Sequence, residues 1–259
     1  MEVSMKSVLI LFLSIFSVSA MAGELFEYKS GKVTLEGYLA TPETKRLNSP
    51  AVLIVHDWMG LSDQMKKKAD EMAEKGYVAL AVDVYGKGVR PKDGKEAGEL
   101  AGKYKNDLRL LRERMSAALK VLKSQRGVDP KQVVAFGYCF GGTSVLELAR
   151  SGADVAGIVS FHGGLATPKL TDAKNIKGKV LVLHGAIDPF VPVAEVDAFQ
   201  KSMNDAKVDY QFIAYSGAVH SFTNPAAGND IKAGAAYNKN ADERSWKAFE
   251  QFLGEVAPL

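Results

Sequence analysis

The sequence predicts an α/β protein in which helices cover both faces of a mostly parallel sheet. Continuously apolar segments such as "AVLIV" alternate along the chain with segments whose apolar residues recur every three or four positions. Strands that are apolar at every residue are typical of parallel sheets, because helices cover both of their faces. The chain of 259 residues, 47% of them hydrophobic, is long enough to bury one large core.

The first half of the chain contains three strand patterns and one clear helix. The strand patterns lie in residues 32–42, 51–57 and 77–85. The first alternates like a half-exposed strand, whereas the other two are almost continuously apolar. We expect a helix from Ser62, its cap, to about Lys75, ended by Gly76. Residues 86–102, which are rich in glycine and lysine, are expected to form a loop over one end of the sheet.

The second half repeats the alternation of strand and helix. Apolar residues at three- and four-residue steps predict one long helix through Tyr104, Leu108, Leu111, Met115, Leu119 and Leu122. Strand patterns follow in residues 132–138, 155–161, 179–185 and 210–215. Helical patterns lie in residues 141–150 and 193–203, and a last helix is expected over about residues 231–252. This order favours right-handed crossovers between parallel strands.

The N-terminal segment, residues 1–22, has the three parts of a secretory signal peptide. An apolar stretch over residues 8–18 follows Lys6, and a small-residue cleavage pattern ends at Ala22. The stretch is shorter than the ~20 apolar residues that a membrane-spanning helix needs, which disfavours a retained anchor. We therefore expect a single mature domain over residues 23–259, exported across the inner membrane to a periplasm and not bound to the membrane after cleavage.

Charge and composition exclude several classes of partner. The formal net charge of +3 is too small for a nucleic-acid interface, and the one lysine cluster, residues 66–68, is followed by acidic residues. One cysteine allows no intramolecular disulfide, and four dispersed histidines have no zinc-ligand spacing. We expect a small-molecule substrate, no metal and no organic cofactor, in a monomer or a weak dimer.

Reactive side chains follow four of the predicted strands. His56 and Asp57 end the first continuously apolar strand, and Cys139, Asp188 and His220 come after three later strands. Open α/β sheets bind their ligands at the carboxyl ends of the strands, so these side chains are expected to lie at one edge of the sheet. The chain order of nucleophile, acid and histidine is that of an α/β-hydrolase triad.

Cys139 lies in the pattern Gly-x-Cys-x-Gly, formed with Gly137 and Gly141. This pattern is typical of a nucleophile on a sharp turn from strand to helix. The N-terminus of the following helix favours a thiolate. We expect the backbone N–H groups of Phe140 and Trp58 to form an oxyanion hole. A lone cysteine is more often a small apolar core residue, and only its conjunction with the acid and the histidine favours catalysis.

Five segments together resemble the dienelactone hydrolase family: "GYCFGG", "HDWMG", "DVYGKG", "HGAIDPFVP" and "GAVHSFTNP". The similarity runs over essentially the whole mature chain. A cysteine in this turn is unusual among α/β-hydrolases, which mostly use serine. The resemblance implies that Cys139 is the nucleophile, that His220 is the general base and acid, and that Asp188 orients His220.

The resemblance also implies further site residues. A carboxylate after the third strand pairs with the resting thiol in this family, and Asp57 occupies that place, where the best-known members have Glu. Tyr85, Lys87 and Asn224 occupy the substrate-binding segments "VYGKG" and "HSFTN". Dienelactone-cleaving members bind the substrate carboxylate with two arginines at the last two positions. Lysine supplies charge without a planar fork, and asparagine supplies neither.

A sulfur nucleophile restricts the ester that the protein can cleave. A thiol with a pKa near ~8.5 leaves a tetrahedral intermediate more readily than an alkoxide, because water and alcohols have pKa values near ~16. Enol lactones, aryl esters and thioesters have leaving groups with pKa values of ~10 or below, so their reactions proceed. The sequence therefore predicts an exported hydrolase of activated esters or lactones that forms an acyl-thioester intermediate.

Two alternatives remain open. A peptidase on the same fold would have to protonate a poor amine leaving group, a step that His220 could perform. A binding or thiol-sensing protein would keep the scaffold and use Cys139 only for oxidation or ligation. The intact set of Cys, Asp and His argues against the second alternative, because a binding protein does not need all three.

Overall fold

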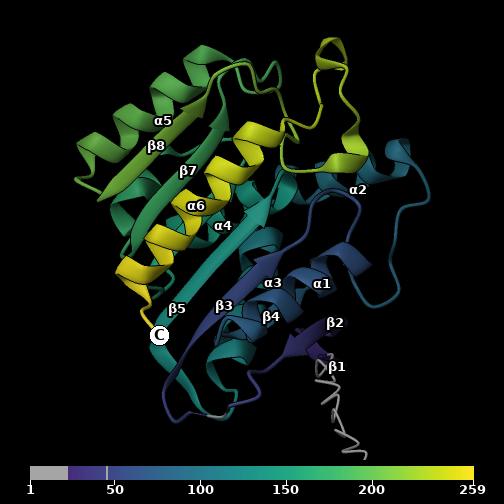
Figure 1. Ribbon diagram of the computed structural model, residues 1–259, viewed down its shortest axis with the longest axis vertical. Helices are drawn as coiled ribbons and strands as arrows, with labels where there is room; N and C mark the ends of the chain where they lie inside the picture. The colour runs from purple at the N-terminus through teal and green to yellow at the C-terminus, as the bar shows by residue number, and fades with distance from the viewer. Residues whose placement is uncertain (1–22, 45) are drawn as a thin grey trace, which may run out of the picture.

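The computed structural model describes residues 23–44 and 46–259, and the strands of this part form one eight-stranded sheet (Figure 1). The expected signal peptide, residues 1–22, lies outside the described residues. The strand order is β1-β2-β4-β3-β5-β6-β7-β8. The β1–β2 and β2–β4 pairs are antiparallel, and every other pair is parallel. The predicted fold class, a mostly parallel sheet with helices on both faces, is confirmed.

The strands are β1 Glu24–Ser30, β2 Val33–Ala40, β3 Ser49–Val55, β4 Val78–Val82, β5 Val128–Tyr138, β6 Gly157–Phe161, β7 Lys179–Gly185 and β8 Tyr210–Tyr215. Every residue of β3, β4 and β6 is buried, as expected of strands covered on both faces. The sequence analysis did not predict β1. It is an edge strand in which charged residues separate Leu25, Phe26 and Tyr28, so it has no continuous apolar run.

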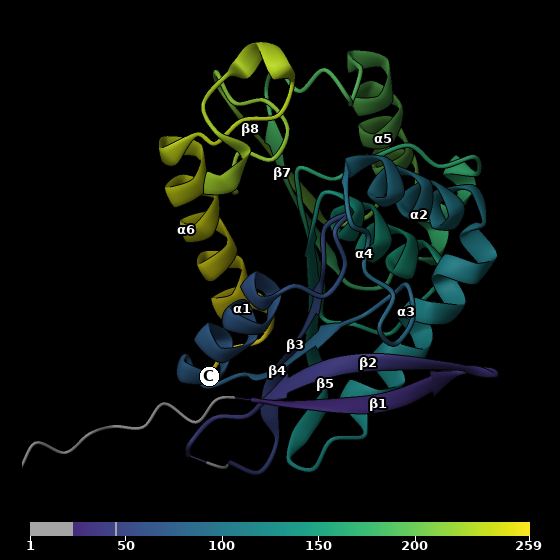
Figure 2. The ribbon, with the colours of Figure 1, turned by 90° about the vertical axis from the view of Figure 1, so that its right-hand side faces the viewer.

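The helices lie in two layers (Figure 2). On one face are α1 Asp63–Glu74 and α6 Lys239–Val256, and on the other are α2 Gly94–Asn106, α3 Leu108–Lys123, α4 Phe140–Arg150 and α5 Val193–Asp205. Each face of the sheet has its own apolar core, and alternate residues of β3 pack into one or the other. Leu53 and Val55 lie on the α3–α4 side, and Val52 and Ile54 lie on the α1–α6 side. In the described part of the chain, no helix is long and apolar enough to cross a membrane.

The segment after β4 contains more helix than the sequence analysis predicted. The expected loop over residues 86–102 includes the start of α2, because Asp93 caps this helix by accepting the N–H of Glu96 at 2.9 Å. The expected long helix through Tyr104 and Leu122 is in fact two helices. Asp107 accepts the N–H of Leu110 at 3.0 Å and so begins α3, which leaves Tyr104 in α2.

The last helix begins later than residue 231. A 3-10 turn over Ile231–Ala233 precedes it, and Gly234 follows this turn with a left-handed φ of 79°. An α-helix of L-residues does not continue through that conformation. Asn238 then caps α6 by accepting the N–H of Ala241 at 3.1 Å. The short turn matters for the site, because Gly234 accepts the backbone N–H of His220 at 3.1 Å.

Candidate active site

Cys139 lies on the sharp turn between β5 and α4. Its φ of 53° and ψ of −112° are strained for a residue with a side chain. Its N–H donates to the carbonyl of Phe161 at 3.0 Å, which holds the turn against β6. A Cβ atom on Gly137 would lie 2.5 Å from the carbonyl of Gly141, and one on Gly141 would lie 2.2 Å from the carbonyl of Val55. Both glycines are therefore required by the close approach of α4 to the sheet.

His220 contacts both of the other residues predicted for a triad. Its Nε2 lies 3.0 Å from Sγ of Cys139, and its Nδ1 lies 2.8 Å from Oδ2 of Asp188. The other oxygen of Asp188 accepts the N–H of Phe190 at 2.9 Å, which fixes the buried carboxylate. The turns after β5, β7 and β8 thus bring together a thiol, an imidazole and a carboxylate that are far apart in the sequence.

The charges around His220 favour its protonated form. Burial lowers the pKa of this imidazole, but its hydrogen bonds to Asp188 and Cys139, together with their negative charges, raise the pKa to about 10. His162 lies beside it, with ring centroids 5.2 Å apart. Burial, and next the neighbouring charge of His220, hold the pKa of His162 well below its ordinary value. One imidazole of the pair is therefore charged while the other is neutral.

A cavity of about 620 Å³ opens beside Cys139 and extends between α1 and α6. Tyr138, Phe161 and Trp246 give it aromatic walls, and His162 and Asn224 also line it. A cavity of this volume is of the size that encloses a small organic molecule. Within residues 23–44 and 46–259, no group of three or more His, Cys, Asp or Glu side chains is arranged to hold a metal ion.

The two residues predicted for an oxyanion hole come from the turns after β5 and β3. Phe140 is the first residue of α4, and Trp58 follows β3 and lines the cavity. In the described part of the chain, neither backbone N–H has a hydrogen-bond partner, so both are available as donors. The Trp58 carbonyl accepts a hydrogen bond from the Tyr85 hydroxyl at 2.9 Å, which holds the loop after β3 against the segment after β4.

Asp57 lines the cavity, but the structure does not pair it with the thiol. Its Oδ1 accepts the N–H of Met59 at 2.8 Å, whereas the hydrogen-bond partner of the Cys139 thiol is His220. Burial raises the pKa of the Asp57 carboxyl, and the Met59 N–H partly offsets this. The short Asp side chain thus closes its own turn, which a longer Glu side chain would not be expected to do.

Two of the three residues predicted to bind substrate, Tyr85 and Lys87, do not line this cavity. Lys87 is exposed and forms an ion pair with Glu27 of β1. Its backbone N–H donates to the Thr34 carbonyl at 3.0 Å, so this part of the loop lies beside β2. Tyr85 is buried, and its hydroxyl binds the Trp58 carbonyl. Asn224 lines the cavity, but its Oδ1 caps the next turn.

Sequence reasoning missed His162 and Trp246 as cavity residues. His162 has a left-handed φ of 41° and directly follows β6, so its place at a strand's carboxyl end was the available signal. Its Nε2 lies 2.8 Å from Oγ1 of Thr223. Trp246 gave no signal, because an aromatic residue at helical spacing in α6 is equally expected in the core.

Comparisons with known proteins place the chain in a family. A family model described as "Dienelactone hydrolase family" matches residues 35–257. The chain is 32% identical over 209 residues to the protein of Aquifex aeolicus named "Putative carboxymethylenebutenolidase", an alignment that covers 78% of this chain and 87% of that one. A solved structure titled "m3DLH" matches with a TM-score of 0.85 and 38% identity, over 91% of this chain and 99% of that chain.

A second solved structure is a dienelactone hydrolase-like promiscuous phosphotriesterase, P91, from metagenomic libraries. It matches with a TM-score of 0.84 and 36% identity, over 90% of this chain and 98% of that chain. These matches extend over almost all of the described residues and include every element that carries the site.

Three histidines are expected to titrate very differently in an NMR pH titration. His220 should lose its proton near pH 10, so its contribution to stability is fully present below pH 6.5, its ordinary pKa, and is lost as the pH rises through about 10. His56, whose pKa burial lowers to about 4, and His162 should stay neutral at pH 7.

Replacing Asp188→Asn should lower the pKa of His220, because the carboxylate on Nδ1 is lost. The matched control is Asp197→Asn, which removes the same charge from an exposed position on α5. A His220 resonance that titrates near pH 6.5 in the unmodified protein would contradict the assignment.

Proposed function

Because the chain belongs to the dienelactone hydrolase family and is a lactone or ester hydrolase, we propose that it cleaves activated esters and lactones with Cys139 as nucleophile. The observation that carries this proposal is the continuous hydrogen-bond chain from Sγ of Cys139 through His220 to Oδ2 of Asp188. A thiol, a base and an orienting carboxylate in this order are what acyl transfer requires.

In the first half of the reaction, the Cys139 thiolate attacks the carbonyl carbon of the substrate. The carbonyl oxygen becomes an oxyanion, which the N–H groups of Trp58 and Phe140 stabilise. Protonated His220 donates its Nε2 proton to the leaving alcohol or enol, and the C–O bond breaks. The product of this half is an acyl group joined to Sγ as a thioester. Asp188 holds the Nδ1–H of His220 throughout and so keeps Nε2 directed at the reacting atoms.

In the second half, neutral His220 takes a proton from water as the water oxygen attacks the thioester carbonyl. The C–S bond then breaks and the carboxylic acid leaves. The thiolate of Cys139 and the imidazolium of His220 are restored. The raised pKa of His220 suits this resting state, because His220 then holds the proton that the next leaving group needs.

The cavity supports a small organic substrate. Its volume is about 620 Å³, and Tyr138, Phe161 and Trp246 form aromatic walls. The acyl or the alcohol part of a substrate packs on these walls if it is apolar or aromatic. Lys67 and Lys68 of α1 and Lys247 of α6 line the same cavity, together with several acidic residues, so its lining is both aromatic and charged.

Replacing Cys139→Ala or His220→Ala is expected to reduce the turnover of a chromogenic aryl ester by about 10³-fold or more, since the members of such a triad act as one unit. The measurement is steady-state hydrolysis of 4-nitrophenyl acetate, with thermal unfolding of each variant as the control for folding. Unchanged turnover in Cys139→Ala would contradict the proposal. Cleavage of amides in addition to esters would favour a peptidase, and oxidation of Cys139 without hydrolysis would favour a thiol sensor.

The leaving group should decide whether an ester is cleaved. For one acyl group, the phenyl ester is expected to react at least about 10³-fold faster than the ethyl ester, because the thiolate leaves in preference to an ordinary alkoxide. The measurement is kcat/KM over a series of alcohols of rising pKa. In Cys139→Ser, an alkoxide replaces the thiolate as the competing leaving group, so any residual activity should depend less steeply on the alcohol. Equal rates for the phenyl and ethyl esters in the unmodified protein would contradict this argument.

We extend the proposal to export from the cytoplasm. It rests on the pattern of residues 1–22, with Lys6, an apolar stretch and a small-residue cleavage site. In a Gram-negative host that expresses the full-length gene, the protein is expected in the periplasmic fraction. Its intact mass should be that of a chain whose first residue is Gly23. A Lys6→Glu variant should accumulate in precursor form, and a cytoplasmic protein that keeps Met1 would contradict the extension.

A further inference from the structure

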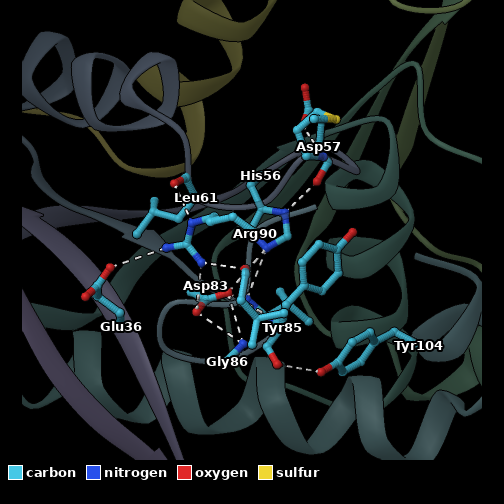
Figure 3. Close-up of polar contacts among 12 residues, drawn as sticks. Glu36, His56, Asp57, Leu61, Asp83, Tyr85, Gly86, Arg90 and Tyr104 are labelled. Atoms are coloured by element: carbon cyan, nitrogen blue, oxygen red, sulfur yellow. Dashed lines mark hydrogen bonds and ion pairs between the residues drawn. The ribbon is translucent and has the colours of Figure 1, made fainter. Parts of the chain in front are cut away.

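His56 is a fully buried histidine that the reaction described above does not use. It directly follows β3 and precedes the loop that carries Trp58. Figure 3 shows its ring lying between two loops, with a dashed contact to Asp57. Its Nδ1 lies 2.5 Å from the carbonyl oxygen of Asp57, and its Nε2 lies 3.1 Å from the backbone nitrogen of Val84. Both ring nitrogens therefore bind backbone groups.

These two contacts determine where the ring carries its proton. A backbone N–H can only donate a hydrogen bond, so Nε2 must accept the N–H of Val84. A carbonyl oxygen can only accept, so Nδ1 must carry the proton that binds Asp57. The ring satisfies both contacts only as the neutral tautomer protonated on Nδ1.

The charged groups around the ring do not change this assignment. The nearest is Asp83, whose Oδ1 lies 4.0 Å from Nε2, but this carboxylate already accepts the N–H groups of Tyr85 and Gly86 and faces Arg90 at 3.5 Å (Figure 3). Burial lowers the pKa of His56 to about 4; the hydrogen bond to the Asp57 carbonyl opposes this, and the charge of Arg90 adds a smaller lowering effect. The ring is neutral at pH 7.

The contact with Asp57 fixes more than a carbonyl. The Asp57 carbonyl and the Trp58 N–H belong to one peptide group, which is planar and trans, so they point in opposite directions. Holding the carbonyl toward His56 therefore holds the N–H away from His56. The same carbonyl also accepts the N–H of Gly60, but at 3.4 Å, which is a longer contact than that to His56.

We infer that His56 is a positioning residue that aims the Trp58 N–H at the oxyanion by holding the Asp57 carbonyl from the opposite side. The inference rests on the proposed function, because it requires the Trp58 N–H to stabilise an oxyanion. The Asp57 side chain on the Met59 N–H and the Tyr85 hydroxyl on the Trp58 carbonyl both fix the next peptide group, which joins Trp58 to Met59. Of these contacts, the one from His56 is made to the peptide group that contains the donor.

Two variants separate this role from a merely structural one. His56→Asn can place a donor near the position of Nδ1 and loses the acceptor for Val84. His56→Gln can place an acceptor near the position of Nε2 and loses the donor to Asp57. Each variant gives up one of the two backbone contacts, so a general loss of packing should affect both alike.

Two reactions of Cys139 then report on the site. Acylation by 4-nitrophenyl acetate, measured in the pre-steady state, forms an oxyanion, whereas alkylation by iodoacetamide displaces iodide at a saturated carbon and forms none. We expect His56→Gln to slow acylation about 10-fold to 100-fold while alkylation changes by less than about twofold, since losing an oxyanion donor affects only the first. His56→Asn should acylate within about fivefold of the unmodified protein.

Equal slowing of acylation in both variants, or a parallel loss of alkylation in His56→Gln, would overturn the inference. An unmodified protein that is not acylated at all would instead overturn the proposed function. The ¹⁵N NMR spectrum of the unmodified protein tests the inference even where a variant does not fold. The expected ring is protonated on Nδ1 and unprotonated on Nε2, and the opposite tautomer would overturn it.

Discussion

The close approach of the first turn of α4 to the end of β3 is the constraint on which the site depends. Gly141 lies so near the Val55 carbonyl that a single added carbon would overlap it, and Gly137 lies equally close to Gly141. Cys139 is thereby forced into a left-handed conformation that lifts its side chain out of the strand. The same packing brings the first turn of α4 beside the end of β3, after which the Trp58 loop begins. The positions of Cys139, Phe140 and this loop thus depend on one contact.

Three histidines near this turn differ in charge and in contacts, and their surroundings determine the difference. His220 lies between a thiol and a carboxylate and is charged. His56 lies between an N–H and a carbonyl, so it is a neutral connector between two loops. His162 is neutral beside the charge of His220 and lines the cavity. Composition alone gives no basis for such a division, because it follows from the partners that each ring nitrogen meets.

The sequence was sufficient to predict the sheet and the turn because both depend on local patterns. Apolar runs, or for β2 an alternating pattern, predicted every strand except β1, whose contacts at the sheet edge require neither. The strand ends also indicated Cys139, Asp188 and His220, since a parallel sheet brings all of its carboxyl ends to one edge. The positions of Lys87 and Tyr85 were not predictable, because they depend on the path of a loop that pairs with β2 and Glu27. Likewise, capping by Asp93 begins a helix inside the expected loop, and capping by Asp107 divides the expected long helix into two.

Because α6 forms one wall of the cavity, the cavity is completed only late in the synthesis and folding of the chain. The thiol lies near the middle of the chain, whereas α6 is its last element, 18 residues long. Contacts across the cavity join residues far apart in sequence, such as Lys68 over the Trp246 ring at 4.2 Å and Lys75 with Glu250 at 2.6 Å. Such contacts are made late, because a long loop must close before they form. A chain still being synthesised therefore contains Cys139 before the cavity beside it is complete.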